Sequence, residues 1–548
     1  MFYGLEIYDY NEARDSQYCW ISAAQWAWPP WAPLMLPDWL MGQSTLGQWS
    51  GYEAWSVPST RGWIIRVIDG LYYLSIILTD EKEKKEREPV FRARIEKILD
   101  NPFGLWESEK PKLKEYVDRL HPFDVKKASD AELAVHVCDC CDWELRMAII
   151  HSYVMAGLGA VTFLFRDKLW EYTKIAPSDV KFSKLMSGFD NMLYHTNKDI
   201  AELGTSAVKL GFKNAFENED PEKLPSILEK SEKGRTWLKQ FNKFLDVWGM
   251  RPTTHGISSP TWIEKPSIPL QEIKRSMSVE GIHAPDRERK RLVKEREELE
   301  KEIVGMAPEK EQAYFRKLMK GAQAWGQFQE DHVYYCEFSA FSLLRRVAIE
   351  AGERLVKAGV FDEPEDAIYL FRDELVTALH AKNRYNIRDI MEKRKAEYQG
   401  YLKRVDLPML VGNPAQFEES VHADPILAIG ISAPIAEPEE VGATVVGAAG
   451  APGVTEGTAR VIMSINELDQ VKPGEILVTL FTSPEWIPVF SVVKGLVTDF
   501  GGALSHTVIV SREYGIPAVV GTMAATAKIK TGQRIRVDGN QLKVNIVD

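Results

Sequence analysis

Residues 499–521 read DFGGALSHTVIVSREYGIPAVVG, and this pattern predicts a strand, a short loop and a helix in that order. Gly501 and Gly502 permit close backbone approach and unusual φ angles in the loop. Ser505 is a favourable N-cap, and Gly515, with a proline two residues later, is a favourable helix end. The C-terminal region is therefore expected to mix strands and helix around this junction.

The histidine of this junction, His506, falls in the predicted first helical turn, with Ser505 and Thr507 as the loop residues that support it. Free N–H groups and the positive end of the helix dipole disfavour an imidazolium there and favour an anion. A neutral imidazole can act as a nucleophile at this place, and the same N–H groups would stabilise a phosphohistidine. The alternative, from the residues alone, is a histidine packed at a helix start as a satisfied core side chain.

Length and composition restrict the class of protein. A chain of 548 residues is too long for one hydrophobic core and predicts two to four domains. The hydrophobic content of 45% and the charged content of 27% are ordinary for a globular protein. The net charge of −11 argues against a nucleic-acid partner, because phosphate backbones select basic surfaces. A small anionic substrate stays compatible with a local basic pocket.

The cysteines and the chain start predict a reduced, cytoplasmic protein without a metal site. Three of the five cysteines lie in HVCDCCDWE, whose spacing does not suit zinc. The first residues, MFYGLEIYDYNEARDS, are acidic where a signal peptide needs positive charge. The apolar run at 148–165 has the length of a membrane span, but His151, Ser152 and the lack of a basic flank favour a buried helix.

Composition divides the chain into four segments. Eight of the sixteen tryptophans lie in the first 63 residues, so residues 1–80 form a Trp-rich N-terminal segment. Dense charge with apolar residues at helical spacing predicts a mostly α-helical domain over 81–427. An Ala-, Gly- and Pro-rich stretch predicts a flexible linker at 428–450. Six short β-type runs and the helix at His506 predict a β/β/α domain at 451–548.

The C-terminal segment resembles a known domain. PGVTEGTARVI, the stretch GEILVTLFTSPEWIPVFSVVKGLVTDFGGALSHTVIVSREYGIPAVVG and RIRVDG together resemble the swivelling phosphohistidine domain of the phosphoenolpyruvate synthase and pyruvate phosphate dikinase group. The resemblance covers residues 450–548 nearly from end to end. It implies that His506 is phosphorylated and travels between two distant active sites.

The helical region resembles the acceptor region of the rifampicin phosphotransferase branch. The stretches that carry this likeness are GFDNMLYHTNKDIAELG, FNKFLDVWGMRP, SPTWIEKP and LLRRVAIEAGERLVKAGVFDEPEDAIYLFRDEL. The resemblance covers residues 180–400 and makes Arg251, which follows WGM, a candidate site residue. The THGISSPTW stretch after Arg251 departs from the acidic pattern expected there, which leaves the role of this arginine open.

Enzymes of this group load their histidine with another domain, and no glycine-rich nucleotide loop is found in the sequence. GLGAVT at 157–162 lacks the third glycine and the preceding strand, and no βα repetition indicates a barrel. The pattern resembles the split phenylphosphate synthases, in which one chain binds the nucleotide and another carries the phosphohistidine and acceptor site. This resemblance implies an ATP-grasp partner subunit, and ATP and Mg²⁺ would be bound mainly by that subunit.

The expected reaction transfers the phosphoryl group from His506 to a phenolic hydroxyl, such as that of phenol or cresol, with AMP and phosphate as co-products. Indole rings offer flat apolar walls with a polar N–H group. The candidates for an aromatic pocket are Trp26, Trp28, Trp31 and Trp39. The candidates for stabilising phosphoryl charge are Arg251, Arg345 and Arg346, and those for a general base are His255, His283 and His332.

Two other functions fit the same sequence. One is a rifampicin-type antibiotic phosphotransferase without its ATP-grasp part, whose acceptor would be a large polyketide. The other is a regulatory carrier in which phosphorylated His506 signals to a partner without acceptor chemistry. Each candidate arginine could instead form a structural ion pair. The tryptophans could instead form a structural collar between domains.

Overall fold

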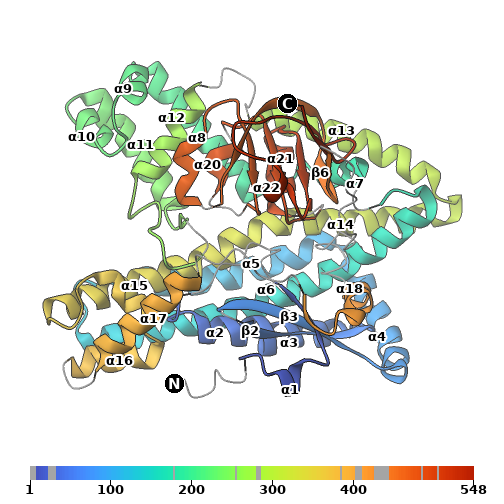
Figure 1. Ribbon diagram of the computed structural model, residues 1–548, viewed down its shortest axis with the longest axis horizontal. Coiled ribbons are helices and arrows are strands. Elements are labelled where there is room, and N and C mark those ends of the chain that lie inside the picture. Colours follow the sequence, from blue (N-terminus) through green and yellow to red (C-terminus); the bar gives the residue numbers. More distant parts are fainter. Residues whose placement is uncertain are drawn as a thin grey trace. The chain divides into compact units, whose positions relative to one another are not determined.

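The computed structural model (Figure 1) defines two compact units, which are described separately. Unit 1 comprises Met1–Phe163, Thr254–Ser259 and His332–Ala428, and unit 2 comprises Leu164–Thr253, Pro260–Asp331 and Ile429–Asp548. The structure describes residues 8–22, 32–68, 70–176, 179–253, 256–278, 285–382, 386–401, 410–424, 444–463, 465–482, 486–490, 492–502 and 505–547. The helical domain predicted at 81–427 is thus distributed over both units.

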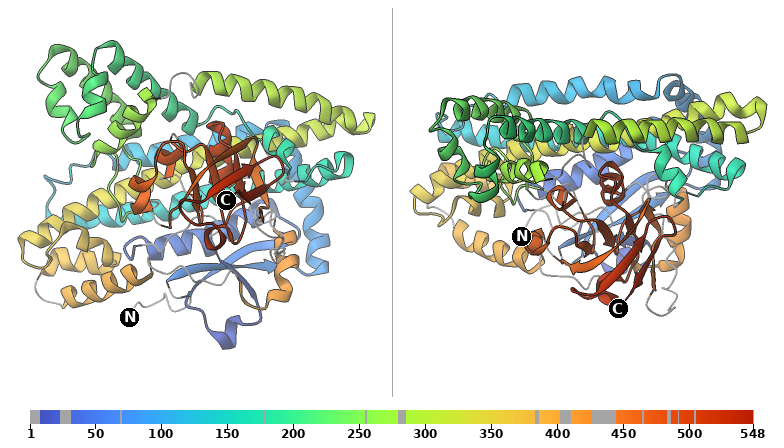
Figure 2. Two further views of the ribbon diagram at one scale, coloured as in Figure 1. Left: turned by 45° about the horizontal axis from the view of Figure 1, so that its top comes forward. Right: turned by 90° about the horizontal axis from the view of Figure 1, so that it is seen from above.

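Unit 1 contains a small antiparallel sheet. Its strands are β1 (Cys19–Ser22), β2 (Thr60–Ile68), β3 (Leu71–Leu78) and β4 (Leu410–Gly412). The order is β2-β3-β1-β4, so the β2–β3 hairpin pairs with a strand of the Trp-rich segment, and that strand pairs with a segment about 400 residues away. Figure 2 shows this sheet in blue with the orange α18 beside it. These strands were not expected from the sequence.

The remaining elements of unit 1 are helical. They are α1 (Glu12–Asp15), α2 (Leu36–Leu40), the π-helix η2 (Met41–Leu46), α3 (Gly47–Trp55), α4 (Glu81–Asp100), α5 (Pro102–Leu120), α6 (Asp130–Thr173), the π-helix η4 (Val333–Phe338), α15 (Ser339–Lys357), η5 (Pro364–Tyr369), α16 (Arg372–Ala381), α17 (Ile387–Tyr401), η6 (Pro414–Gln416) and α18 (Phe417–Ala423). The 44-residue α6 continues into unit 2.

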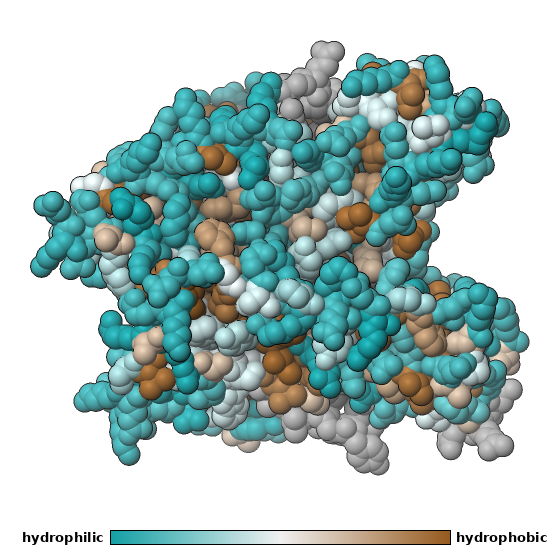
Figure 3. All heavy atoms as spheres, turned by 180° about the vertical axis from the view of Figure 1, so that it is seen from behind, coloured by the Kyte–Doolittle hydropathy of each residue, from teal (hydrophilic) through white to brown (hydrophobic). Residues whose placement is uncertain are grey.

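Helix α6 contains the apolar run that raised the question of a membrane. By length and composition it could cross a membrane, but 72% of its most apolar window is buried inside the protein. On the face shown in Figure 3, hydrophilic residues predominate and hydrophobic residues form small separate groups. The burial of this window supports the interpretation of the run as a core helix.

The helical part of unit 2 consists of α7 (Val180–Leu185), α8 (Met192–Lys209), α9 (Lys213–Asn218), α10 (Leu224–Leu228), α11 (Glu232–Trp248), α12 (Ser267–Ser278), α13 (Pro285–Met306), η3 (Glu309–Glu311) and α14 (Gln312–His332). Helix α11 shows how the sequence defines them. The Ser231 hydroxyl caps its first turn by accepting from the Gly234 N–H, and one stripe of aromatic residues faces the core. That stripe includes Trp237, Phe241 and Trp248.

The C-terminal domain of unit 2 is built on a mixed sheet of eight described strands. They are β5 (Thr444–Val446), β6 (Ala449–Ala451), β7 (Val454–Val461), β8 (Ile476–Thr479), β9 (Gly495–Thr498), β10 (Ala518–Val520), β11 (Arg534–Asp538) and β12 (Lys543–Ile546), in the order β5-β12-β11-β7-β8-β9-β10-β6. The four strands β7, β8, β9 and β10 run parallel to one another, and the other pairs are antiparallel. All six strands expected from the sequence are present.

The C-terminal limit of the predicted linker is wrong. Strand β5 and the first two residues of β6 lie inside residues 428–450, so this end of the predicted arm belongs to the sheet. The alanines and glycines that gave this stretch its linker composition are needed for close packing. A Cβ on Gly450 would lie 2.3 Å from the Ala518 carbonyl oxygen on β10. Residues 428–443 of the predicted linker lie outside the described part.

Two apolar clusters cover the faces of this sheet. One contains Ile535, Val537 and Val544 and packs against α22 (Ala525–Lys528). The other packs the sheet against α20 (Ile487–Phe490) and α21 (His506–Glu513), and it includes Leu193 of α8. A further short helix, the 3₁₀ helix η7 (Ile465–Gln470), follows β7. In Figure 1 this domain is the dark red part around α21. The mostly helical body and mixed C-terminal domain agree with the expected fold class.

Candidate functional site

His506 is the first residue of α21, as the sequence predicts. The loop before it turns at Gly501, whose φ of 120° is a conformation that glycine adopts without strain. A Cβ at that position would lie 2.9 Å from Ser505 Oγ. Ser505 occupies the N-cap position in an extended conformation, and its carbonyl accepts from the N–H groups of Val508 and Ile509.

The predicted cap is present in backbone form only. The Ser505 side chain makes no capping hydrogen bond to the first turn of α21. In the described part of the chain, its hydroxyl has no hydrogen-bond partner. The serine beside His506 is thus held by the turn geometry, and its hydroxyl is buried against the glycine loop.

The His506 ring contacts two side chains that the sequence analysis did not single out. Thr482 Oγ1 lies 3.4 Å from His506 Nδ1 and 2.9 Å from Thr507 Oγ1. The Phe490 ring meets the imidazole edge-on, with centroids 6.0 Å apart. Thr482 lies between β8 and α20, so only the tertiary fold brings it to the histidine. These contacts direct Nδ1 towards Thr482, and Nε2 is also buried.

Hydrogen bonds at the end of β9 hold the start of the glycine loop. Asp499 Oδ1 lies 2.9 Å from Thr522 Oγ1, and the Asp499 carboxylate also accepts from the backbone N–H of Thr526. Thr498 Oγ1 donates to the Phe500 carbonyl at 2.7 Å. This network ties the strand that leads into the glycine loop to the segment after β10, so the loop starts from a rigid base.

The far end of α21 contacts the helical part of unit 2. The Tyr514 hydroxyl donates to Asn197 Oδ1 of α8 at 2.9 Å. Burial and the nearby Glu272 carboxylate raise the pKa of Tyr514, while Arg251 opposes this shift. Tyr514 also lies 6.0 Å from Phe490, ring to ring. Aromatic contacts therefore link His506, through Phe490, to a polar cluster on the helices of the same unit.

Arg251 belongs to this cluster. Its guanidinium lies 5.1 Å above the Trp262 ring, and its carbonyl accepts from the Trp262 N–H at 2.9 Å. Only 9% of the residue is exposed. Of the three candidate arginines, Arg251 lies in the same unit as His506, near Tyr514.

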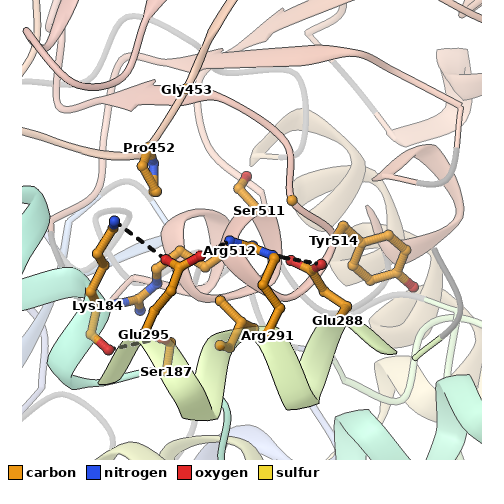
Figure 4. A pocket seen from close by; sticks show the side chains of 12 residues that line it. Lys184, Ser187, Glu288, Arg291, Glu295, Pro452, Gly453, Ser511, Arg512 and Tyr514 are labelled. Atoms are coloured by element: carbon orange, nitrogen blue, oxygen red, sulfur yellow. Dashed lines mark hydrogen bonds and ion pairs between the residues drawn. The ribbon is translucent and has the colours of Figure 1, made fainter. Parts of the chain in front are cut away.

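A cavity of about 380 Å³ lies behind α21, on the side of Ser511, Arg512 and Tyr514. Figure 4 shows that its opposite wall is α13, with Arg291 between two glutamates. Arg291 is paired with both Glu288 and Glu295, and Lys184 lies 3.3 Å from Glu295. The charges on the helical wall therefore largely compensate one another.

The other candidates lie elsewhere or have structural partners. Arg345 donates to the Ile257 carbonyl at 3.0 Å and pairs with Glu365 at 3.4 Å, both within unit 1. Arg346 donates to three carbonyls at the end of α5, and burial lowers the pKa of its guanidinium. These contacts give both arginines the structural role considered above.

Of the three candidate bases, His332 lies within the described residues. It lies in unit 1, stacked on His151 with ring centroids 4.7 Å apart, and it is 9% exposed. His255, His283, Trp26, Trp28 and Trp31 lie outside the described residues, as does the side chain of Trp39. Within the described residues, no group of three or more His, Cys, Asp or Glu side chains is arranged to hold a metal ion.

Family comparisons identify both regions. Residues 471–541 match the mobile domain of phosphoenolpyruvate-utilising enzymes, and this range contains His506, Thr482 and Asp499. Residues 150–330 match the fourth domain of rifampicin phosphotransferase. The chain is thus similar to the mobile domain of phosphoenolpyruvate-utilising enzymes over one region and to a rifampicin phosphotransferase domain over another.

Individual relatives agree with this class. The chain is 31% identical over 339 residues to an uncharacterised phosphotransferase of Bacillus subtilis, a match that covers 61% of this chain and 39% of the relative. It is 28% identical over 398 residues to a rifampicin phosphotransferase of a Streptomyces species, covering 71% of this chain and 43% of that protein. A probable phosphoenolpyruvate synthase of Pyrococcus horikoshii is 45% identical over 107 residues, which are 20% of this chain and 13% of the synthase. The chain spans less than half the length of each of these relatives.

Proposed function

We propose that this chain accepts a phosphoryl group on His506 and transfers it to the hydroxyl of a small aromatic acceptor. The observation that supports this most strongly is the position of His506. It begins α21, after a glycine-shaped loop, within the segment that matches the mobile domain of phosphoenolpyruvate-utilising enzymes. The match supports the class of chemistry, and the loop geometry supports His506 as the residue that carries it.

In this proposal Nε2 of His506 forms the P–N bond. Nδ1 faces Thr482, so the opposite nitrogen is the candidate nucleophile, and because it is buried in this structure, domain movement must expose it before it meets a phosphorus atom. The Ser505 hydroxyl and the first turn of α21 then stabilise the phosphoryl oxygens through hydrogen bonds and the helix dipole. A neutral imidazole is the reactive form, and this helix end favours it over the imidazolium.

Loading uses ATP bound with Mg²⁺ on an ATP-grasp partner chain. Over the whole cycle, ATP, water and the phenol give AMP, phosphate and the aryl phosphate. In the second half the P–N bond breaks, a P–O bond forms at the acceptor oxygen, and the phenolic proton passes to a base. Most of this chemistry consists of in-line positioning and compensation of charge.

Arg251 is the candidate for charge compensation, since it lies in the unit of His506, near Tyr514. Domain movement brings His506 to each partner site in turn. The polar contact between Tyr514 and Asn197 and the charged wall of α13 suit such movement, because water can replace them when the domain leaves.

A second candidate acceptor is a rifamycin-type antibiotic. It is favoured by the relatives named rifampicin phosphotransferase, which are 28% and 31% identical to this chain over 398 and 327 residues. The phosphohistidine chemistry would be the same, and only the size of the acceptor would differ.

The test combines the chain with a candidate ATP-grasp partner and radiolabelled ATP. We expect an acid-labile, base-stable label on the chain, located to His506 by mass spectrometry, and AMP formation that depends on phenol or cresol. The label must be absent in His506→Asn. The proposal would be rejected if His506→Asn were labelled as strongly as the parent chain. It would also be rejected if the parent chain carried no label. Acceptor-dependent AMP with rifamycin but not with phenols would select the second candidate.

A further inference from the structure

One leucine from the helical part of unit 2 belongs to an apolar cluster of the C-terminal domain. Leu193 lies in the first turn of α8, is 4% exposed, and packs into the cluster that includes Trp486 and Phe490. Every other described member of this cluster comes from residues 451–518. Burying a leucine side chain favours the buried state by about tenfold to a hundredfold. Leu193 is therefore a strong apolar link between α8 and the C-terminal domain.

A polar link to the same domain lies on the same face of α8. Asn197, whose side chain accepts from the Tyr514 hydroxyl, is four residues after Leu193. Residues four apart in a helix lie one above the other on one face. The two links also meet beside Phe490, because the Tyr514 ring lies 6.0 Å from the Phe490 ring. One face of α8 thus makes an apolar and a polar contact with the C-terminal domain.

The start of α8 is held in place by other helical residues. The Asn191 side chain accepts from the Tyr194 N–H at 2.9 Å, which caps the first turn. The Met192 N–H donates to Asp331 Oδ1 of α14 at 3.0 Å. Leu193 lies between these anchored residues, so it meets the C-terminal domain from a fixed position.

At the far end of α21 the contact with the helical part is polar and incompletely packed. The cavity of about 380 Å³ lies there, lined by residues of α21 and α13. On the α13 wall Arg291 pairs with Glu288 and Glu295, so these charges are used within that helix (Figure 4). Water can occupy such a contact and replace it when the two surfaces part. The apolar contact of Leu193 is therefore the part of the docking that water cannot replace.

The docked position also affects the reactive ring. The Phe490 ring meets the His506 imidazole edge-on, with centroids 6.0 Å apart, and Phe490 is fully buried in the cluster that Leu193 completes. Nδ1 of the imidazole faces Thr482, and Nε2 is buried as well. A buried nitrogen cannot attack phosphorus, because in-line attack needs room for the phosphoryl group at its lone pair. The docked state therefore keeps His506 from reacting.

We propose that Leu193 and Asn197 of α8 form a dock that holds the C-terminal domain in a resting position, in which His506 is shielded. The dock clamps Phe490 against the imidazole, and undocking frees the ring. The fraction of undocked molecules then sets the observed reactivity of the histidine, as for any reaction of a minor conformer. The role of the shielded nitrogen as phosphoryl carrier rests on the function proposed above, whereas the dock itself does not.

Diethyl pyrocarbonate tests the shielding without ATP or a partner chain. This reagent transfers an ethoxycarbonyl group to a neutral imidazole nitrogen, which loses its proton, and ethanol and carbon dioxide are released. In the full chain, mass spectrometry should show that His506 is modified at least about tenfold more slowly than the exposed His380 of α16. Leu193→Ala should increase the His506 rate at least about tenfold and leave the His380 rate unchanged.

Leu203→Ala is the matched control. Leu203 is 6% exposed on the same helix but outside this cluster, and its carbonyl accepts from the Trp237 indole N–H of α11 at 3.1 Å. This variant should keep the His506 rate within about twofold of the parent chain, because it leaves the dock intact. Asn197→Ala removes only the polar link and should raise the rate about threefold to tenfold. It keeps the test valid if Leu193→Ala impairs folding.

Equal modification of His506 and His380 in the parent chain would overturn the shielding. A parent-like His506 rate in both Leu193→Ala and Asn197→Ala, or an equal increase in Leu203→Ala, would overturn the dock.

The dock and the proposed function fail separately. Faster modification in Leu193→Ala, without any phosphoryl label on His506 in the presence of ATP and the partner, would retain the dock and reject the function. ATP-dependent labelling of His506, together with unchanged modification rates in the α8 variants, would retain the function and reject the dock.

Discussion

The loop at His506 and the inner face of α6 differ in how their polar side chains are held. The His506 ring is partly exposed and is held by Thr482, Phe490 and the turn at Gly501. On α6, Glu144 and Ser152 are fully buried, with no side-chain hydrogen bond in the described residues. The first region has its geometry before any substrate arrives. The second has buried polar groups that the described residues leave unpaired.

This difference separates orientation by local structure from burial by the rest of the fold. A nucleophile needs fixed orientation, which a short loop and one helix end can supply locally. A polar side chain inside a helical core depends instead on what other helices place around it. The four tests below separate these two conditions, beginning with the largest expected effect.

His506→Asn should lower phosphoryl transfer by about 1000-fold or more, because the nucleophile is lost. The melting temperature of the same variant should stay close to that of the parent chain, because the ring is partly exposed and the buried face of α6 lies in the other unit. The measurements are acceptor-dependent AMP formation and thermal unfolding. A parallel loss of stability would contradict the separation of the two regions.

Gly501→Ala should disturb the loop strongly. An alanine at a φ of 120° is strained, and its Cβ would lie 2.9 Å from Ser505 Oγ. The expected loss of unfolding free energy is about 2–3 kcal/mol, with slower His506 labelling. Gly474→Ala is the control, because Gly474 also has a positive φ of 82° but nothing within 4 Å of its Cβ position. Equal effects on labelling would show that the Ser505 contact is unimportant.

His136 on α6 tests how burial acts on a polar group of this helix. It stacks on Phe123 at 3.9 Å, and burial, aided by Arg346, lowers its pKa to about 4. The folded state therefore binds a proton at His136 less tightly than the unfolded state does. The stability that the neutral imidazole contributes is complete above pH 6.5 and is lost as the pH falls towards 4.

The expected loss between pH 7 and pH 5 is up to about 2 kcal/mol, measured by urea unfolding. His136→Leu should remove this part of the pH dependence. The slope should be retained in His380→Leu, since His380 is exposed at the end of α16. An unchanged slope in His136→Leu would contradict the assignment.

Tyr514→Phe should have the smallest effect. It removes the hydrogen bond to Asn197 and keeps the ring against Phe490, so the expected cost is about 1 kcal/mol. The measurement is hydrogen exchange of the α8 amides, which should become a few times faster. In a double-mutant cycle, Asn197→Ala should add little to Tyr514→Phe. Full additivity would show that the two side chains do not interact.

Local pattern was sufficient for much of the C-terminal domain. The six expected strands and the helix that begins at His506 are present, because β-branched runs, glycines and the residue at the N-cap act over a few positions. The linker limit failed because Ala- and Gly-rich composition fits both a flexible arm and tightly packed edge strands. The β1–β4 pairing was missed because it joins segments about 400 residues apart.

The sequence by itself determined the place of His506 at a helix start and the resemblance to a phosphohistidine domain, which makes His506 the candidate nucleophile, since these features depend on neighbouring residues. Only the tertiary structure decided that Thr482 contacts the imidazole, that Arg251 lies in the same unit as His506, and that Gln48, Glu144 and Ser152 are buried without side-chain partners in the described residues. The physical reason is that burial and hydrogen-bond satisfaction depend on what the rest of the chain places around a side chain, and no local pattern records this.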